Sequence, residues 1–404
     1  MAKHEPSSLR NIAIVGHGGT GKTSLCEALL YVSGKTDRLG RVDDGFSVMD
    51  FEPEEQKRHI SINTAVNFVD WGKDKVNIVD TPGDSNFAMD TLNGLRVVDA
   101  ALVVIDAVGG VEFQTEKVWE YADRYSLPRI VYVNKMDRER ADFSRALESV
   151  KKAFGRKVTP LYLPIGQEEA FKGLVDLLAM KALIFEDPKG NYRIEEVPAD
   201  LQKEAARLRD ALVEDVAEGE EHLMERYIEN GSLEPEELKE GLRKSVISGD
   251  MIPVICGSAL KCIGIKPLLD AMVEFLPSPL DRGPARGKKP GTDSVEERPP
   301  DLSAPFSAFV FKTIADPYAG KLTLFRVYSG TATSDATFYN PTKKLTERFG
   351  NIFYLEGKTQ RPAESLVPGD IAAVAKLKET STGDTMCDEK APIVYERPPV
   401  LPAV

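Results

Sequence analysis

The sequence has few cysteines, no long apolar run and an excess of negative charge. Its four cysteines, Cys26, Cys256, Cys262 and Cys387, lie far apart and lack the C-x-x-C spacing of zinc and redox sites, which predicts reduced thiols and no cysteine-bound metal. No stretch approaches the roughly 20 apolar residues of a membrane helix, and residues 1–10 lack the apolar core of a signal peptide. We therefore expect a cytoplasmic protein with no membrane partner.

The formal net charge of −12 disfavours sequence-independent binding of nucleic acid, because such binding depends on Lys and Arg that neutralise phosphates. Most of this charge lies in residues 186–240, where 18 side chains are acidic and 7 are basic. A chain of 404 residues with 42% hydrophobic content is expected to fold into two or three domains, each with its own core.

Short β-branched runs alternate with helical patterns in the first part of the chain. Buried strands are expected at 11–15, 76–79, 101–105 and 130–133, and helices at 22–31, 114–125 and 141–154. The alternation predicts an α/β fold, a doubly wound and mostly parallel sheet covered on both faces, with its ligand at the carboxyl ends of the strands. A charged helical region at 199–248, before another apolar strand at 252–256, is interpreted as an inserted subdomain.

The remainder of the chain favours β-structure. Residues 277–305 are rich in Pro, Gly and charge and are interpreted as a linker. Strand-like segments follow at 306–313, 322–329, 335–339 and 371–376, which predicts a small β-barrel. The predicted domains are 1–290, with the insert at about 158–250, a linker at 291–304 and a barrel at 305–396.

A phosphate-binding motif follows the first predicted strand and opens the first helix. The pattern G-x-x-x-x-G-K-S/T is met by Gly16, His17, Gly18, Gly19, Thr20, Gly21, Lys22 and Thr23. Glycines let backbone N–H groups surround phosphates, Lys22 can reach the β- and γ-phosphates, and the Thr23 hydroxyl is a predicted Mg²⁺ ligand. The alternative, a Gly-rich turn without a ligand, is disfavoured by the flanking strand and helix.

A second motif, Asp80, Thr81, Pro82 and Gly83, follows the strand at 76–79. The Asp80 carboxylate is predicted to hold Mg²⁺ through water, and the Gly83 N–H to meet the γ-phosphate. By itself D-x-x-G is a common turn, but its position after a strand downstream of the phosphate-binding motif favours the nucleotide role.

A third motif, Asn134, Lys135, Met136 and Asp137, ends the strand at 130–133 and predicts the base. The Asp137 carboxylate can accept from guanine N1–H and from its exocyclic amine, a pair of donors that adenine lacks. Each unpaired group would cost about 1–3 kcal/mol. The alternative is a charged surface turn.

A fourth segment follows the strand at 252–256. There the backbone N–H groups of Ser258 and Ala259 are predicted to meet guanine O6. A P-loop kinase of small molecules is disfavoured, because the third motif specifies guanine and no substrate lid is apparent.

The four motifs in this order, with an insert before the last and a barrel after it, resemble elongation factor G. Further similarities lie at Pro164–Gly166, Leu276–Pro279, Phe325–Gly330 and Gly369–Val374, so the resemblance covers nearly the whole chain. It implies a GTPase that acts on the ribosome, with its GTPase domain on large-subunit rRNA and its barrel on the small subunit. A monomer is expected.

The acidic insert is similar to the family's G′ subdomain, which contacts ribosomal stalk proteins; a solvated helical face is the alternative. The family has five domains. Residues 397–404 resemble the beginning of the third, so we expect this chain to be part of a longer protein.

Two positions depart from the family pattern. Arg58–Ile62 stands where the family has Arg-Gly-Ile-Thr-Ile, so Ser61 keeps a hydroxyl for Mg²⁺ while His59 lacks the freedom of glycine for positive φ. Asp84 stands where the family has a histidine that orients the attacking water. An ionised Asp84 about 4 Å from the γ-phosphate would cost on the order of 4 kcal/mol at an effective dielectric of about 20, roughly a thousandfold in rate.

Catalytic roles are predicted for Lys22, Ser61 and Asp84, with slow hydrolysis in the absence of ribosomes. Two functions stay open at this point. The first is a ribosome-stimulated GTPase that promotes translocation or ribosome recycling, and the second is a GTP-gated ribosome-binding regulator in which Asp84 abolishes hydrolysis. Ribosome-protection and release-factor GTPases share the same motifs.

Overall fold

The computed structural model describes residues 4–155, 157–316 and 320–401. They form two compact units, each of which is described by itself. The parallel-sheet unit comprises Ile14–Ser47 and Ala100–Leu276, and the antiparallel-sheet unit comprises Met1–Ala13, Val48–Asp99 and Pro277–Val404. Of the predicted beginning of a third domain, residues 402–404 lie outside the described part of the chain.

Parallel strands form the centre of the parallel-sheet unit, in the order β4-β5-β11-β6, and the end of β1 (Leu9–Val15) lies beside β4. Their bounds are Ala100–Asp106 for β4, Arg129–Asn134 for β5, Met251–Cys256 for β11 and Lys157–Pro160 for β6. Strands β4, β5 and β11 are buried along their whole length, as expected for a parallel sheet covered on both faces. The register pairs Asp106 with Asn134 and Cys256 with Val133, so the carboxyl ends of three strands meet at one edge.

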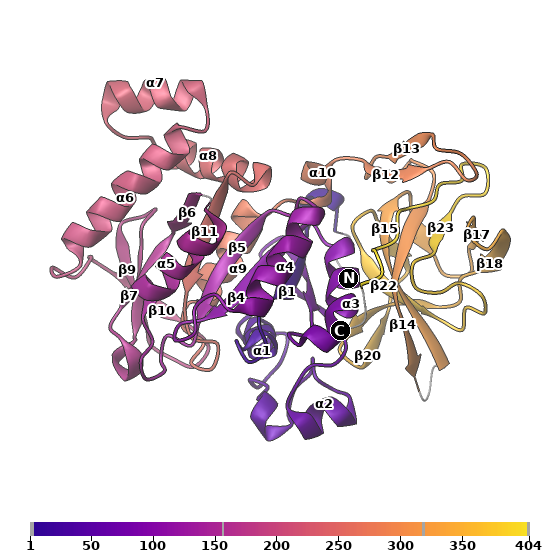
Figure 1. Ribbon diagram of the computed structural model, residues 1–404, viewed down its shortest axis with the longest axis horizontal. Helices are drawn as coiled ribbons and strands as arrows, with labels where there is room; N and C mark the ends of the chain where they lie inside the picture. The colour runs from indigo at the N-terminus through magenta and orange to yellow at the C-terminus, as the bar shows by residue number, and fades with distance from the viewer. Residues whose placement is uncertain (1–3, 156, 317–319, 402–404) are drawn as a thin grey trace. The chain divides into compact units, whose positions relative to one another are not determined.

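Four helices accompany these strands: α1 (Lys22–Val32), α4 (Phe113–Arg124), α5 (Phe143–Phe154) and α9 (Ile265–Phe275). Helices α4 and α5 lie in front of the strands in Figure 1. The Trp119 ring of α4 stacks on the Phe154 ring of α5 with centroids 3.6 Å apart, and α1 packs against α9. Helix α5 begins where the Asp142 carboxylate accepts from Arg145 N at 2.9 Å, and it ends at Gly155 with φ 57°. The strand and helix alternation expected from the sequence is therefore present.

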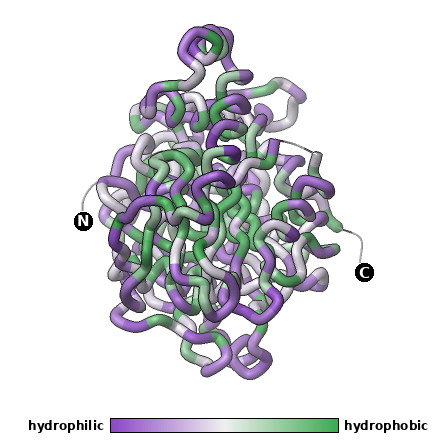
Figure 2. The backbone as a smooth tube through the Cα atoms, turned by 90° about the vertical axis from the view of Figure 1, so that its left-hand side faces the viewer, coloured by the Kyte–Doolittle hydropathy of each residue, from purple (hydrophilic) through white to green (hydrophobic). Residues whose placement is uncertain are grey.

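The insert combines a small sheet with three helices. The sheet has the antiparallel order β10-β9-β8-β7, and the strands are Tyr192–Glu195, Lys181–Phe185, Gly173–Asp176 and Tyr162–Ile165. The charged region expected as one helical stretch is three helices: α6 (Gln202–Ala217), α7 (Glu221–Asn230) and α8 (Pro235–Ser248). Gly231, with φ 69°, ends α7, and a capping box between Glu234 and Glu237 begins α8. Helix α7, at the top of Figure 2, is mostly hydrophilic.

The antiparallel-sheet unit begins with strands β2 (Ala65–Trp71) and β3 (Asp74–Asp80), in the order β2-β3-β1. Strand β2 pairs antiparallel with β3, and a tight turn with Gly72 at φ 60° connects the two strands. Strand β2 was not among the strands expected from the sequence. The short α2 (Pro53–Arg58) precedes β2, and the 3₁₀ turn η3 (Ser85–Phe87) and α3 (Ala88–Arg96) follow β3.

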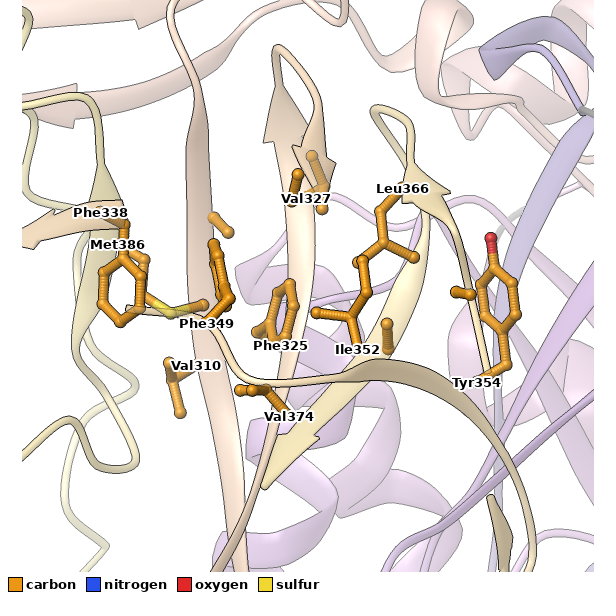
Figure 3. Close-up of a cluster of buried hydrophobic side chains, with 14 of the residues drawn as sticks. Val310, Phe325, Val327, Phe338, Phe349, Ile352, Tyr354, Leu366, Val374 and Met386 are labelled. Atoms are coloured by element: carbon orange, nitrogen blue, oxygen red, sulfur yellow. The ribbon is translucent and has the colours of Figure 1, made fainter. Parts of the chain in front are cut away.

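An eight-stranded antiparallel sheet occupies the predicted barrel region, in the order β18-β17-β23-β14-β15-β22-β19-β20. In chain order the strands are β14 (Ser307–Asp316), β15 (Gly320–Ser329), β17 (Thr337–Asn340), β18 (Leu345–Arg348), β19 (Ile352–Glu356), β20 (Thr359–Pro362), β22 (Ile371–Ala375) and β23 (Thr385–Cys387). The short β16 (Ala332–Thr333) pairs with β21 (Ser365–Leu366). Aromatic and branched side chains fill the core beside the eight-stranded sheet (Figure 3). In this core the Phe325 ring stacks on the Phe349 ring with centroids 5.7 Å apart.

The segment expected as a linker contains regular structure. Helix α10 (Pro279–Arg282) is followed by the hairpin of β12 (Ala285–Lys288) and β13 (Val295–Arg298). The hairpin is attached to the rest of its unit, because Lys288 and Val394 exchange two backbone hydrogen bonds of 2.8 Å. The abundance of Pro and Gly in this segment thus reflects turns between short elements. Within residues 4–155, 157–316 and 320–401, no helix is both long and apolar enough to cross a membrane.

Candidate functional site

The phosphate-binding motif forms the loop between β1 and α1 in the parallel-sheet unit. Gly16, Gly19 and Gly21 have φ values of 147°, 79° and 88°, which side-chain-bearing residues rarely adopt. A Cβ on Gly16 would lie 2.3 Å from the Val104 carbonyl oxygen, and one on Gly21 would lie 2.6 Å from Asn134 Nδ2. The loop backbone therefore lies directly against the ends of β4 and β5, which requires glycine at both positions.

Lys22, in the first turn of α1, is folded over this loop. Its Nζ donates to the Gly16 carbonyl at 3.1 Å and to the His17 carbonyl at 2.9 Å, and its side chain is buried. Gly21 is the N-cap of α1, and it has no side chain that could cap the first N–H groups of the helix. The loop thus combines a lysine cation with a helix N-terminus, an arrangement suited to phosphate.

Asn134 connects this loop to the segment after β11. Its Nδ2 donates to the Thr20 carbonyl at 2.9 Å, and its Oδ1 accepts from Ala259 N at 3.0 Å. The side chain is 1% exposed, so both hydrogen bonds are shielded from water. One amide therefore holds the predicted phosphate segment and the predicted base segment together.

Lys135 also contacts the phosphate-binding loop, and the Asp106 carboxylate, which was not predicted as a site residue, orients it. Its Nζ donates to the Gly19 carbonyl and lies 2.9 Å from Asp106 Oδ2. Burial alone would raise the pKa of Asp106, but the Val108 N–H and the Lys135 and Arg138 cations hold that pKa below its ordinary value. The only sequence signal for Asp106 was its position at the carboxyl end of a predicted strand.

Asp137 and the segment after β11 lie beside Asn134. The half-buried Asp137 carboxylate accepts no hydrogen bond from the described residues and is therefore available to a ligand. Gly257 donates to the Val133 carbonyl at 3.0 Å and accepts from Met136 N at 3.1 Å, which fixes the backbone that leads to Ser258 and Ala259.

Tyr132, on β5, packs against the segment after β11 that carries Ser258 and Ala259. No sequence pattern predicted this role. A Cβ on Gly257 would lie 2.3 Å from the Tyr132 hydroxyl, so this position requires glycine. The Tyr132 hydroxyl donates to the Ile263 carbonyl at 3.4 Å, and burial raises its pKa well above the ordinary value. Tyr132 therefore contributes as a neutral hydrogen-bonding group beneath the segment.

The remaining predicted site residues belong to the antiparallel-sheet unit. Asp80 ends β3 with 2% of its surface exposed, Thr81 is fully buried, and the Thr91 hydroxyl of α3 donates to the Pro82 carbonyl at 3.0 Å. The turn after β3 is thus held against the helix that follows it.

Asp84 lies on the surface and acts as a helix cap. Its Oδ1 accepts from Asn86 N at 2.9 Å and from Asn86 Nδ2 at 2.8 Å, at the start of η3. The Asp84 side chain is exposed, so this cap is in contact with solvent.

Ser61 follows α2, which ends at Arg58 with His59 as its C-cap. His59 has φ 54°, so it adopts the left-handed conformation although it lacks the freedom of glycine for positive φ. Glu55, 2% exposed, holds the next residues, since its Oε1 accepts from Ile62 N and Asn63 N, each at 2.9 Å. The segment that carries Ser61 is therefore pinned to α2 by a buried carboxylate.

The residues predicted to hold Mg²⁺ are divided between the two units, with Thr23 in the parallel-sheet unit and Ser61 and Asp80 in the antiparallel-sheet unit. Among the residues that the structure describes, no three or more His, Cys, Asp or Glu gather into a metal cluster. The predicted Mg²⁺ ligands are of another kind, the hydroxyls of Thr23 and Ser61 and the carboxylate of Asp80, and Mg²⁺ commonly takes one or two protein oxygens together with phosphate oxygens. The glycine cradle, which a Cβ at Gly16 or Gly21 would fill, fits the phosphates that would complete such a set.

Comparisons with known proteins agree with this arrangement. Residues 7–278 match the family model of the elongation factor Tu GTP binding domain, and residues 305–389 match that of elongation factor G domain 2. The fold is similar to a crystal structure of a protein from Thermus thermophilus, with a TM-score of 0.85 and 30% sequence identity. That match covers 97% of this chain and 56% of the other, so this chain spans little more than half the length of its relative. Because the first family model alone covers well over half of the chain, the chain belongs to the translation-factor GTPases, of the elongation factor G-like type.

Proposed function

We propose that this chain binds GTP with Mg²⁺ and hydrolyses it to GDP and phosphate on the ribosome, to promote translocation or ribosome recycling. The proposed domains are a GTP-binding domain at 1–290, with the G′ insert at about 158–250, a linker region at 291–304 and a second domain at 305–396. The proposed partners are rRNA and stalk proteins of cytoplasmic ribosomes, with the chain acting as a monomer. The matches to both family models support this assignment.

The observation that carries the nucleotide assignment is the double hydrogen bond of Asn134. It joins Thr20 of the phosphate loop to Ala259 of the base segment, so that both halves of a nucleotide could be held at a fixed separation. Asp137, with no competing hydrogen bond from the described residues, would accept from guanine N1–H and the exocyclic amine. Ser258 and Ala259 N–H groups would meet guanine O6.

In the proposed mechanism Lys22 binds the β- and γ-phosphates, and Thr23, Ser61 and Asp80 hold Mg²⁺. The ion would neutralise charge that develops on the β- and γ-phosphate oxygens. The protein residues bind and orient the nucleotide, and the hydroxyl of Ser61 would close over the γ-phosphate. Most of the catalytic effect in such a site comes from positioning and electrostatics.

Asp84 decides between this proposal and its alternative, a GTP-gated ribosome-binding regulator that does not hydrolyse. With the carboxylate exposed, a charge about 4 Å from the γ-phosphate would cost about 1 kcal/mol rather than 4, which is about fivefold in rate. The cap that Asp84 provides to Asn86 favours the alternative, because it occupies Oδ1 and fixes the side chain, so that only Oδ2 is left to orient water.

The test is single-turnover hydrolysis of radiolabelled GTP, with and without purified ribosomes. Strong stimulation by ribosomes supports the enzyme, tight GTP binding without hydrolysis in either condition supports the regulator, and failure to bind GTP contradicts both. Asp84→His should raise the rate, and Asp84→Asn, which keeps a capping side chain but removes the charge, should raise it about fivefold if charge is the obstacle. An unchanged or lower rate in both variants would show that Asp84 does not limit hydrolysis.

A further inference from the structure

A lysine of the second domain is buried against the segments that flank Ser61 and Asp80. Lys312, on β14, is 7% exposed. Its ammonium forms an ion pair with the Asp90 carboxylate of α3 and donates to Asn63 Oδ1 at 3.1 Å. All these residues belong to the antiparallel-sheet unit.

An irregularity in β14 places Lys312 on this face. In an uninterrupted strand, residues 309 and 312 would point to opposite sides of the sheet. The register of β14 against β15 shifts between Val310, which pairs with Phe325, and Lys312, which pairs with Leu324, so one extra residue is inserted. Phe309 and Lys312 therefore both face α3, where Arg96 lies 5.0 Å from the Phe309 ring centroid and Asp90 meets Lys312.

Asp90 also holds the residues that follow Ser61. Its Oδ2 accepts from Thr64 N at 2.7 Å, and its carbonyl accepts from the Thr64 hydroxyl at 3.2 Å. Glu55 of α2 accepts from Ile62 N and Asn63 N, so the segment 62–64 is held both by α2 and by α3. Lys312 adds a third connection, because its ammonium joins Asn63 and Asp90 to β14 of the second domain.

We propose that Lys312 is a positioning residue that makes the preference for GTP over GDP depend on the second domain. This inference rests on the proposed function, in which Ser61 and Gly83 meet the γ-phosphate. When both segments are in place, the buried ammonium has a carboxylate and an amide oxygen as partners. Departure of segment 61–64 after loss of the γ-phosphate would remove the amide oxygen and leave the cation less well compensated, which is unfavourable for a buried charge.

The coupling is reciprocal by thermodynamic linkage. A second domain that holds Lys312 in place favours the GTP-bound arrangement, and GTP in turn favours the attachment of the β14 face to α3. The domain that contacts a partner would thereby report the state of the nucleotide.

The experiment compares the dissociation constants of GDP and a non-hydrolysable GTP analogue in wild-type protein and Lys312→Met. Methionine retains length and apolar contact but removes the charge. The ratio of the GDP to the analogue constant should fall by fivefold or more, and Lys312→Arg should restore it to within twofold of wild type. Asp90→Asn tests the same contact from the other partner and should also lower the ratio.

Lys75→Met is the matched control. Lys75 is a buried lysine of the same unit, whose ammonium pairs with Asp370 at 3.0 Å and lies 3.6 Å from the Tyr354 ring centroid. Its loss should lower thermal stability and leave the nucleotide ratio within twofold of wild type. Lys321→Met, which removes a lysine bonded to the Thr380 carbonyl at 2.6 Å, serves the same purpose if Lys75→Met is too unstable to assay.

An unchanged ratio in folded Lys312→Met and Asp90→Asn overturns the inference and leaves the proposed function intact. An equal fall in the control overturns it as well, because general loosening would then explain the effect. A wild-type protein that binds neither nucleotide overturns the proposed function itself.

Discussion

Replacement of Asn134 by Ala should weaken nucleotide binding far more than the loss of one side chain suggests. The substitution leaves the Thr20 carbonyl and the Ala259 N–H without partners, and both residues are at most 2% exposed. A buried polar group without a partner costs about 1–3 kcal/mol, so the two together cost roughly 2–6 kcal/mol. The free protein can relax to relieve part of this cost, but a bound nucleotide needs both segments in place.

If only about 2 kcal/mol of this cost falls on the bound state, GTP affinity decreases about thirtyfold. Isothermal titration calorimetry would measure the GTP affinity, and urea unfolding would confirm that Asn134→Ala is folded. Asn77→Ala is the matched control, since Asn77 is also a buried asparagine, bonded to Asn11 Oδ1 at 2.7 Å in the other unit. It should lower stability and leave affinity unchanged. A GTP affinity of folded Asn134→Ala within twofold of wild type would show that the two Asn134 hydrogen bonds do not support nucleotide binding.

Three further predictions concern single groups. His59→Gly should raise the free energy of unfolding in urea by about 1 kcal/mol, because His59 is exposed at φ 54°; equal or lower stability would argue against strain there. The Val108 N–H, together with the Lys135 and Arg138 cations, lowers the pKa of Asp106, so the ionised carboxylate stabilises the fold fully above the unfolded pKa of about 4, and this contribution is lost as pH falls through the still lower folded pKa. The difference in unfolding free energy between wild type and Asp106→Asn should thus be constant near neutral pH and shrink below about pH 4; a difference that persists to about pH 3 or below without change would be inconsistent with this pKa direction. Burial raises the pKa of Cys262 to about 12, so the native thiol should not react with Ellman's reagent at about pH 8 and should react after unfolding; rapid reaction in the native state would show that the thiol is accessible.

The parallel-sheet unit was predictable because its signals are local. Residues 100–105 of β4 are a continuous run of apolar residues, and Gly16–Thr23 carries its own phosphate-binding pattern, so each could be placed without knowledge of its neighbours. The charged region was harder to divide. Gly231 and Pro235 separate α7 from α8, but the helical composition on both sides led us to expect one continuous helical region.

Other features depend on contacts between distant residues. Strand β2 depends on its pairing with β3, and the hairpin at 285–298 depends on its backbone hydrogen bonds to Val394. The composition of these segments alone therefore did not predict their structure. Asp106 and Tyr132 matter because of the segments they touch, and the bulge that turns Lys312 toward Asp90 exists only in the register of two strands. A sequence motif locates the groups that meet a ligand, whereas the groups that hold them in place emerge from the fold.

The most direct test of the account is equilibrium binding of GTP, GDP and ATP in the presence of Mg²⁺, to wild-type protein and to Asp137→Ala. Both guanine nucleotides should bind at least about tenfold more tightly than ATP, because ATP would leave buried groups unpaired at a cost of about 1–3 kcal/mol each, and Asp137→Ala should narrow this difference in affinity. ATP binding as tight as GTP binding, or guanine preference that survives in Asp137→Ala, would contradict the account.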